Sequence, residues 1–290
     1  MKSVRLWLGA ACLTWAATVG AQVPAVPLAE EFAREVDRQL KLPETEQLAY
    51  ARLLQQTLAE RGLATVGAQF VLLVDRSPHV QAALLYWKPS ADAAELPRFV
   101  GASPISSGRP SGFEHFETPL GVFDHSLANP DFRAEGTPNG FGIRGYGAKG
   151  RRVFDFGWQE ATRGWGSRGT SPMRLQLHAT DPQALEPRLG TQQSKGCIRT
   201  TGGLNRFLDM YAILDADYDA ALASGESFWL LLPERRVTPW SGRYLVIVET
   251  QRSERPDWAP WPSAVARPPA KPASAPVDVA CAEAPAHGKR

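Results

Sequence analysis

A histidine and a cysteine in the second half of the sequence could together perform nucleophilic chemistry. His178 ends the alternating stretch Met173–His178, which predicts a strand, and Cys197 follows a loop over residues 181–193. A cysteine becomes a nucleophile when it loses its proton, and a neighbouring imidazole can accept that proton. The order strand, loop, cysteine would return the thiol beside the imidazole, and it therefore predicts a catalytic Cys–His pair.

The residues around Cys197 suit the same chemistry. Gly196 lets the backbone approach a substrate carbonyl closely, and the amides of Gly196 and Cys197 could stabilise an oxyanion. Arg199 adds a fixed positive charge shortly after the thiol, suited to holding a carboxylate.

Other interpretations of these residues stay open. Cys197 could be a buried structural cysteine, and His178 could be a hydrogen-bonded histidine at a strand end. Arg199 could pair with an acid such as Asp209. A metal site would need three or four ligands. No ligand spacing is recognisable among the remaining histidines, which are His79, His115, His125 and His287.

Composition and charge exclude several protein classes. The chain has 290 residues, of which 43% are hydrophobic and 21% charged, and this excludes a wholly disordered protein. The net charge of +2 is too small for a nucleic-acid binder that works by bulk charge. With 25 Gly, 24 Pro and 9 Trp, the composition favours a loop-rich β protein over a helical bundle.

The N-terminus has the pattern of a secretory signal peptide, and we assign it residues 1–21. Lys2 and Arg5 form a basic start, Leu6–Val19 is apolar, and Val19-Gly20-Ala21 places small residues where a signal peptidase cleaves. The apolar run is shorter than the ~20 residues of a membrane span. We therefore expect an exported protein without a permanent membrane span.

Export changes which cysteines can pair. Removal of the signal peptide takes Cys12 and leaves Cys197 and Cys281, which an oxidising compartment would usually join. Cys281 lies within residues 251–290, a Pro- and Ala-rich segment that we predict to be a disordered tail. A disulfide between these two cysteines stays open as an alternative to a reduced nucleophile.

The elements that must position the pair lie between these termini. Residues 22–67 hold two amphipathic patterns, from Leu28 to Gly62, that predict a helical hairpin. Residues 68–250 are predicted to form the catalytic domain. We expect this domain to be a mainly β sandwich with mixed or bent sheets and a helix over Gly203–Leu214. Irregular loops over residues 129–171 are expected to form one wall of a binding cleft. The predicted strands are Phe70–Asp75, Gln81–Trp87, Arg98–Ser103, a strand that begins at Gly121, Met173–His178, Ser227–Leu232 and Tyr244–Val248.

Residues from about 68 to 250 resemble the catalytic domain of L,D-transpeptidases, the YkuD-type domain. That family's signature is a histidine, a spacer, and then Ser/Thr-His-Gly-Cys followed by an apolar residue and Arg or Asn. Ser194–Arg199 follows this signature except at Lys195, which stands where the family most often has histidine. Phe99–Ser103 resembles a strand of that domain, and Glu117–Phe123 resembles its TPxG.F segment.

The resemblance implies a YkuD-like β-sandwich and a role for each site residue. Cys197 would be the nucleophile and His178 its base, while the carbonyl of Ala179 would orient the imidazole and Gly196 would support the oxyanion. Substrate contacts would come from Ser194, Lys195 and Arg199.

The implied reaction is a two-step acyl transfer on peptidoglycan stem peptides, without a cofactor. Cys197 would attack the carbonyl of meso-diaminopimelate in a tetrapeptide stem and release D-Ala, and the amine of a second stem would then form a 3-3 cross-link. Water as acceptor would give an L,D-carboxypeptidase. A lipoprotein could replace the second stem as acceptor. Alternatively, the enzyme could hydrolyse the bond that links a lipoprotein to peptidoglycan, as an amidase. The resemblance places such an enzyme in the periplasm, associated with the cell wall. A non-catalytic wall-binding module is the rival from another class.

Overall fold

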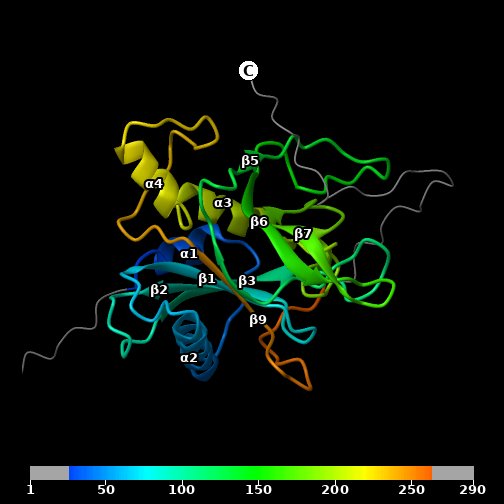
Figure 1. The fold of residues 1–290 in the computed structure, drawn as a ribbon, viewed down its shortest axis with the longest axis horizontal. Coiled ribbons are helices and arrows are strands. Elements are labelled where there is room, and N and C mark those ends of the chain that lie inside the picture. Colours follow the sequence, from blue (N-terminus) through cyan, green and yellow to red (C-terminus); the bar gives the residue numbers. More distant parts are fainter. Residues whose placement is uncertain (1–25, 263–290) are drawn as a thin grey trace, which may run out of the picture.

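Over residues 26–262, which a computed structural model describes, nine strands form one curled, mixed sheet (Figure 1). The order of strands across it is β4-β9-β1-β2-β3-β8-β7-β6-β5. The strands are β1 (Gln69–Asp75), β2 (Ala82–Lys88), β3 (Arg98–Ser106), β4 (Gly121–Asp124), β5 (Phe132–Arg133), β6 (Arg152–Thr162), β7 (Thr170–Ala179), β8 (Ile198–Thr200) and β9 (Tyr244–Val248). The helices are α1 (Ala29–Glu35), α2 (Glu44–Glu60), the short 3-10 helix η1 (Glu186–Arg188), α3 (Gly202–Met210) and α4 (Ala216–Ala223).

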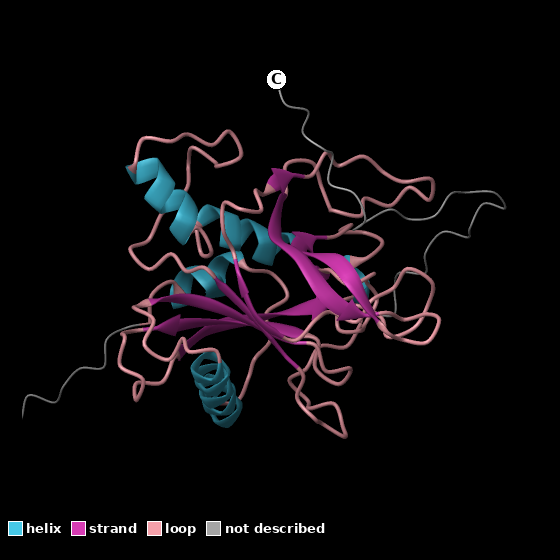
Figure 2. Cartoon of the chain, viewed as in Figure 1, coloured by secondary structure: helices cyan, strands magenta, loops and turns pink. Residues whose placement is uncertain are grey.

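The two halves of the sheet are joined through β3. Residues Arg98–Pro104 of β3 pair with β2, and Ile105 and Ser106 then pair with β8. β8 runs parallel to β7, and β9 runs parallel to β1, so the sheet is mixed. Figure 2 shows the strands as one continuous surface bent across the molecule. The mainly β prediction with a mixed, bent sheet is confirmed, and the more specific sandwich arrangement stays a prediction.

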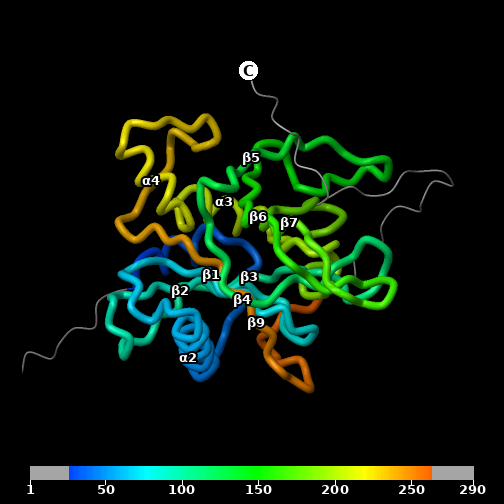
Figure 3. The backbone as a smooth tube through the Cα atoms, viewed as in Figure 1, coloured from blue at the N-terminus to red at the C-terminus, as the bar shows by residue number. Residues whose placement is uncertain are grey.

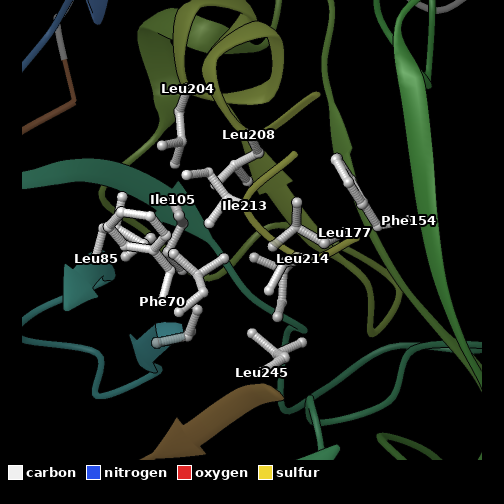
Figure 4. Close-up of a cluster of buried hydrophobic side chains, with 14 of the residues drawn as sticks. Phe70, Leu85, Ile105, Phe154, Leu177, Leu204, Leu208, Ile213, Leu214 and Leu245 are labelled. Atoms are coloured by element: carbon white, nitrogen blue, oxygen red, sulfur yellow. The ribbon is translucent and has the colours of Figure 1, made fainter. Parts of the chain in front are cut away.

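The first half of the sheet is buried on both faces. Phe70, Leu72 and Val74 of β1 belong to one hydrophobic cluster, while Val71 and Leu73 belong to a second cluster on the other face. Successive side chains of a strand point to opposite faces, so a continuous apolar run marks a strand covered on both sides. Figure 4 shows the first cluster, in which side chains of β1, β2, β3, β6, β7, β9 and α3 meet.

The two N-terminal helices exist where the amphipathic patterns predict them, but they cover different faces. Phe32 and Val36 pack in the first cluster with α3, whereas Tyr50, Leu54 and Leu58 of α2 pack in the second. Figure 1 accordingly shows α1 and α2 on opposite sides of the strands. The prediction that they form a hairpin is not confirmed.

Three other expectations need correction. Residues 129–171 were expected to be irregular, but Arg152–Thr162 within them forms the long strand β6. The strand forms despite the glycines of this region because it pairs antiparallel with β7. The predicted strand Ser227–Leu232 is a loop. Residues 251–262, assigned to the tail, are ordered against α2, where Trp258 meets the Tyr50 ring at 6.0 Å. The predicted signal peptide and the rest of the tail lie outside the described residues.

Segments far apart in the sequence meet at one edge of the sheet, where β4 pairs antiparallel with β9 (Figure 3).

In residues 26–262, no helix has both the length and the apolar character needed to cross a membrane.

A buried cluster of charges joins β6 to the segments before β5 and α4. His125 is 1% exposed, and its ring nitrogens lie 2.7 Å from the Leu214 carbonyl and 2.8 Å from Asp131 Oδ1. Both partners accept hydrogen bonds, so the ring is a doubly protonated imidazolium. Arg152 donates to Asp131 at 2.6 Å and to Asp215 at 2.8 Å, so the cations and carboxylates compensate one another.

This cluster predicts how stability depends on pH. Burial lowers the pKa of His125, but the Asp131 carboxylate outweighs burial, and the pKa of His125 is raised. A raised pKa in the folded state stabilises the protein fully below the unfolded value of about 6.5, and this stabilisation is lost as pH rises through the folded pKa. Asp131→Asn should cost about 3 kcal/mol of unfolding free energy near neutral pH and remove that part of the pH dependence.

Urea denaturation across the pH range measures both effects. Asp124→Asn, at a carboxylate whose side chain is 44% exposed, is the matched control and should cost less than about 1 kcal/mol. Equal losses for the two variants would contradict the charge-cluster assignment.

Candidate active site

The parallel pairing of β7 with β8 brings together the strand of the candidate base and the loop of the candidate nucleophile. Leu177 pairs with Ile198 and His178 with Arg199. Leu177 and Ile198 both lie in the first hydrophobic cluster, and alternation along the strands sends His178 and Arg199 to the opposite face. Cys197 directly precedes Ile198, so the loop that carries it enters the sheet next to the strand of His178.

The sulfur of Cys197 lies at the β7 backbone. Cys197 Sγ is 3.8 Å from the carbonyl oxygen of Arg174, and the residue is 0% exposed. The sulfur is disulfide-bonded in this structure. Cys12 and Cys281, the other cysteines of the sequence, lie outside the described residues. Any nucleophilic role for Cys197 therefore requires the reduced thiol.

The imidazole of His178 is held as a neutral base. Its Nδ1 lies 2.6 Å from the carbonyl oxygen of Ala179, the contact expected from the sequence, and a carbonyl can only accept, so Nδ1 carries the proton. Nε2 is then left with the lone pair that a base needs. Burial, together with the positive charge of Arg199, lowers the pKa of His178 to about 3. The ring is therefore neutral at physiological pH, and its Nε2 lone pair is unprotonated.

The loop that carries Cys197 is bonded along its backbone to residues 108–118. The amide of Arg109 donates to the Ser194 carbonyl at 3.0 Å, and the amide of Phe116 donates to the Lys195 carbonyl at 3.2 Å. The hydroxyl of Ser194 donates to the Cys197 carbonyl at 2.5 Å and accepts from the Gly196 amide at 3.0 Å. The role of Ser194 in this structure is thus to shape the loop.

Thr118 completes this framework, and the sequence reasoning did not assign it a role. Its hydroxyl donates to the Gly196 carbonyl at 2.6 Å and accepts from the Gly108 amide at 2.7 Å, and the residue is 0% exposed. Thr118 lies in the segment that resembles TPxG.F, and that resemblance was the available signal.

Two glycines allow this close approach. Gly196 has a φ of +134°, a conformation that side chains disfavour, and an added Cβ would lie 2.6 Å from Met173 Sδ. A Cβ on Gly108 would lie 2.0 Å from the Phe116 carbonyl oxygen. Because the Gly196 amide already bonds the Ser194 hydroxyl, that amide would have to exchange its partner to support an oxyanion.

Two cationic side chains flank the loop. Lys195 Nζ lies 3.1 Å from Glu114 Oε2, and Arg199 Nη1 lies 3.4 Å from the Gln193 carbonyl oxygen. Asp209, the acid considered as a partner of Arg199, instead pairs with Arg133 at 2.6 Å. The predicted substrate residues Lys195 and Arg199 therefore contact Glu114 and the Gln193 carbonyl, on the loop and strand that flank Cys197 in the sequence.

The polar face of β7 continues beyond His178, and the ring of Tyr146 covers part of it. Tyr146 meets the His178 ring edge to face at a centroid distance of 4.7 Å, and its hydroxyl donates to Gln176 at 3.0 Å. Tyr146 lies in residues 129–171, and no local pattern in the sequence linked it to His178. Its ring covers one side of the His178 imidazole.

The helix α3 does not present its N-terminus to the thiol. Strand β8 separates them, and the first turn of α3 is capped by the Thr201 hydroxyl, which accepts from Leu204 at 3.0 Å. Glu186 accepts from the Gly202 amide at 2.6 Å. Among residues 26–262, no group of three or more His, Cys, Asp or Glu side chains is arranged to hold a metal ion.

Comparison with known proteins adds no assignment, since no family model matches the chain and no curated protein matches it.

The framework around Gly196 predicts the effect of removing one hydroxyl. Thr118→Val leaves the Gly196 carbonyl and the Gly108 amide buried without this partner, which should cost about 2 kcal/mol of unfolding free energy. Amide hydrogen exchange at residues 194–197 should become faster, because the loop loses its tie to residues 108–118.

Thr118→Ser should restore both properties. Thr57→Val, which removes a hydroxyl bonded within α2, should leave exchange at residues 194–197 unchanged. Unchanged exchange in Thr118→Val would show that Thr118 does not hold the loop.

The protonation state of His178 can be measured directly. Because its pKa is lowered to about 3, the ring signals of His178 should not titrate between about pH 5 and pH 8 in ¹⁵N-edited NMR spectra. His178→Gln identifies the signals. A His178 midpoint near the ordinary value of about 6.5 would contradict the neutral-base assignment.

Proposed function

We propose that the protein is a cysteine acyltransferase of the L,D-transpeptidase type that acts on peptidoglycan stem peptides. The observation that carries the proposal is the neutral imidazole of His178, oriented by Ala179 on the strand that pairs with β8 directly after Cys197. Such a base can take the thiol proton as the sulfur attacks a carbonyl.

The burial of Cys197 by itself would fit a structural cysteine equally well. Two further features favour a reacting residue. The loop backbone before the thiol is fixed by residues 108–118, and Gly196 adopts a conformation that leaves no side chain at that point. Backbone constraint of this kind keeps a reacting atom in place and supports the proposal.

The resemblance supplies the substrate class. The described fold is compatible with a YkuD-like domain, because a mixed β sheet carries the histidine strand next to the Gly-Cys loop. We propose that reduced Cys197 attacks the carbonyl of the third stem residue, His178 passes its proton to the departing D-Ala amine, and the amine of a second stem or lipoprotein resolves the thioester. Localisation in the periplasm at the cell wall belongs to the same proposal.

Mass spectrometry of a reaction with tetrapeptide muropeptides tests the proposal. The reduced protein should release D-Ala and form 3-3 dimers, and Cys197→Ala should lower both by at least about 10³-fold, because the covalent intermediate cannot form. Cys197→Ser, which replaces the thiol by a hydroxyl at the same position, is the conservative control.

The products separate the alternatives. Tripeptide without dimers would indicate an L,D-carboxypeptidase, and release of lipoprotein from sacculi would indicate an amidase at the same site. Turnover that is equal in Cys197→Ala would overturn the cysteine mechanism. Binding without turnover would favour a wall-binding module.

A further inference from the structure

Three cationic side chains gather beside the loop that carries Cys197. Arg109 bonds the Ser194 carbonyl through its amide and reaches His115 Nε2 with its guanidinium at 3.1 Å. Lys195 and Arg199 lie on either side of Cys197 in the sequence. Burial lowers the pKa of His115, and the positive charges of Arg109, Lys195 and Arg199 lower it further.

His115 adds no charge to this group. Its Nδ1 lies 2.8 Å from the Phe113 carbonyl oxygen and carries the proton, while Nε2 accepts from Arg109. The neutral ring therefore fixes Arg109 in place and leaves the cluster positive. A group of side chains that carries one sign of charge attracts ligands of the opposite sign.

Glu114 is the carboxylate that reaches into this cluster. It pairs with Lys195 at 3.1 Å from a loop position with φ of +57°. The Glu114 side chain is 49% exposed, whereas that of Lys195 is only 13% exposed. An ion pair with one partner so open to water contributes little to stability, and a second carboxylate can replace Glu114 at low cost.

We propose that Lys195, with Arg109 and Arg199 beside it, receives a carboxylate of the substrate and that Glu114 occupies this position until substrate displaces it. The inference rests on the proposed function and deepens it, because it makes free carboxylates on the stem peptide a condition of tight binding. The amide of Phe116 holds the Lys195 backbone, so a carboxylate on Lys195 is bound at a fixed place relative to Cys197. This is a consequence of lysine rather than histidine at this position.

Binding and turnover are measured separately, so that the two proposals can fail independently. Isothermal calorimetry uses Cys197→Ala protein and two ligands, a tetrapeptide stem with free carboxylates and the same stem with its carboxylates converted to carboxamides. The free-carboxylate stem should bind at least about tenfold more tightly, and Lys195→Met in this background should abolish the preference.

Further variants keep the test decisive. Lys195→Arg should retain the preference, because it keeps the charge. Glu114→Gln should tighten binding of the carboxylate stem by a few-fold and leave the carboxamide stem unchanged, even if Lys195→Met fails to fold. Lys41→Met, at an exposed lysine between α1 and α2, is the matched control and should change neither affinity.

The results overturn one proposal or the other. A carboxylate preference that survives Lys195→Met, equal affinity for both stems, or failure of the free-carboxylate stem to bind overturns the carboxylate site. Turnover of the free-carboxylate stem by the reduced, intact-thiol protein decides the acyltransferase proposal by itself. Binding with the predicted preference but without turnover would leave the carboxylate site standing and the enzyme proposal refuted.

Discussion

The parallel pairing of β7 with β8 is the constraint on which the candidate site depends. Parallel strands need a crossover, here residues 180–197, and the crossover ends in the loop that carries Cys197. A shift of one residue in this register would move His178 to the apolar face and Leu177 to the polar one. Because Leu177 and Ile198 are both buried in the core, the hydrophobic cluster itself holds the register.

A second layer of constraint holds the loop once the register is set. Residues 108–118 bond the carbonyls of Ser194, Lys195 and Gly196, and β3, which precedes them, also pairs with β8. The same strand therefore bends the sheet and delivers the segment that fixes the loop. The buried charges around Arg152 anchor β6, the partner of β7 on its other side. The interactions that fix the order of the strands thus also fix the geometry of the candidate site.

The positive charges around the candidate site have two different effects, one on His178 and one on the surroundings of Cys197. His178 is kept neutral by burial and by Arg199, which suits a base, while the cations at Lys195, Arg109 and Arg199 keep positive potential beside the thiol. A positive charge near a sulfur favours the thiolate as well as an anionic ligand. Under the proposed function, this one cluster would assist both the ionisation of Cys197 and the binding of a carboxylate.

The sequence by itself determined the local elements and the residue types of the site. Apolar runs and alternation predicted β1, β2, β3, β7 and β9, and the order His178 then Ser194–Arg199 selected the pair, because these signals depend on neighbouring residues alone. Tertiary structure decided what depends on distant partners. The strand β6 forms despite its glycine because β7 pairs with it, the two N-terminal helices separate to cover opposite faces, and His125 enters a buried charge cluster. Thr118 and Glu114 likewise acquire their roles only when residues 108–118 are brought against the loop, since no local pattern encodes a contact across the chain.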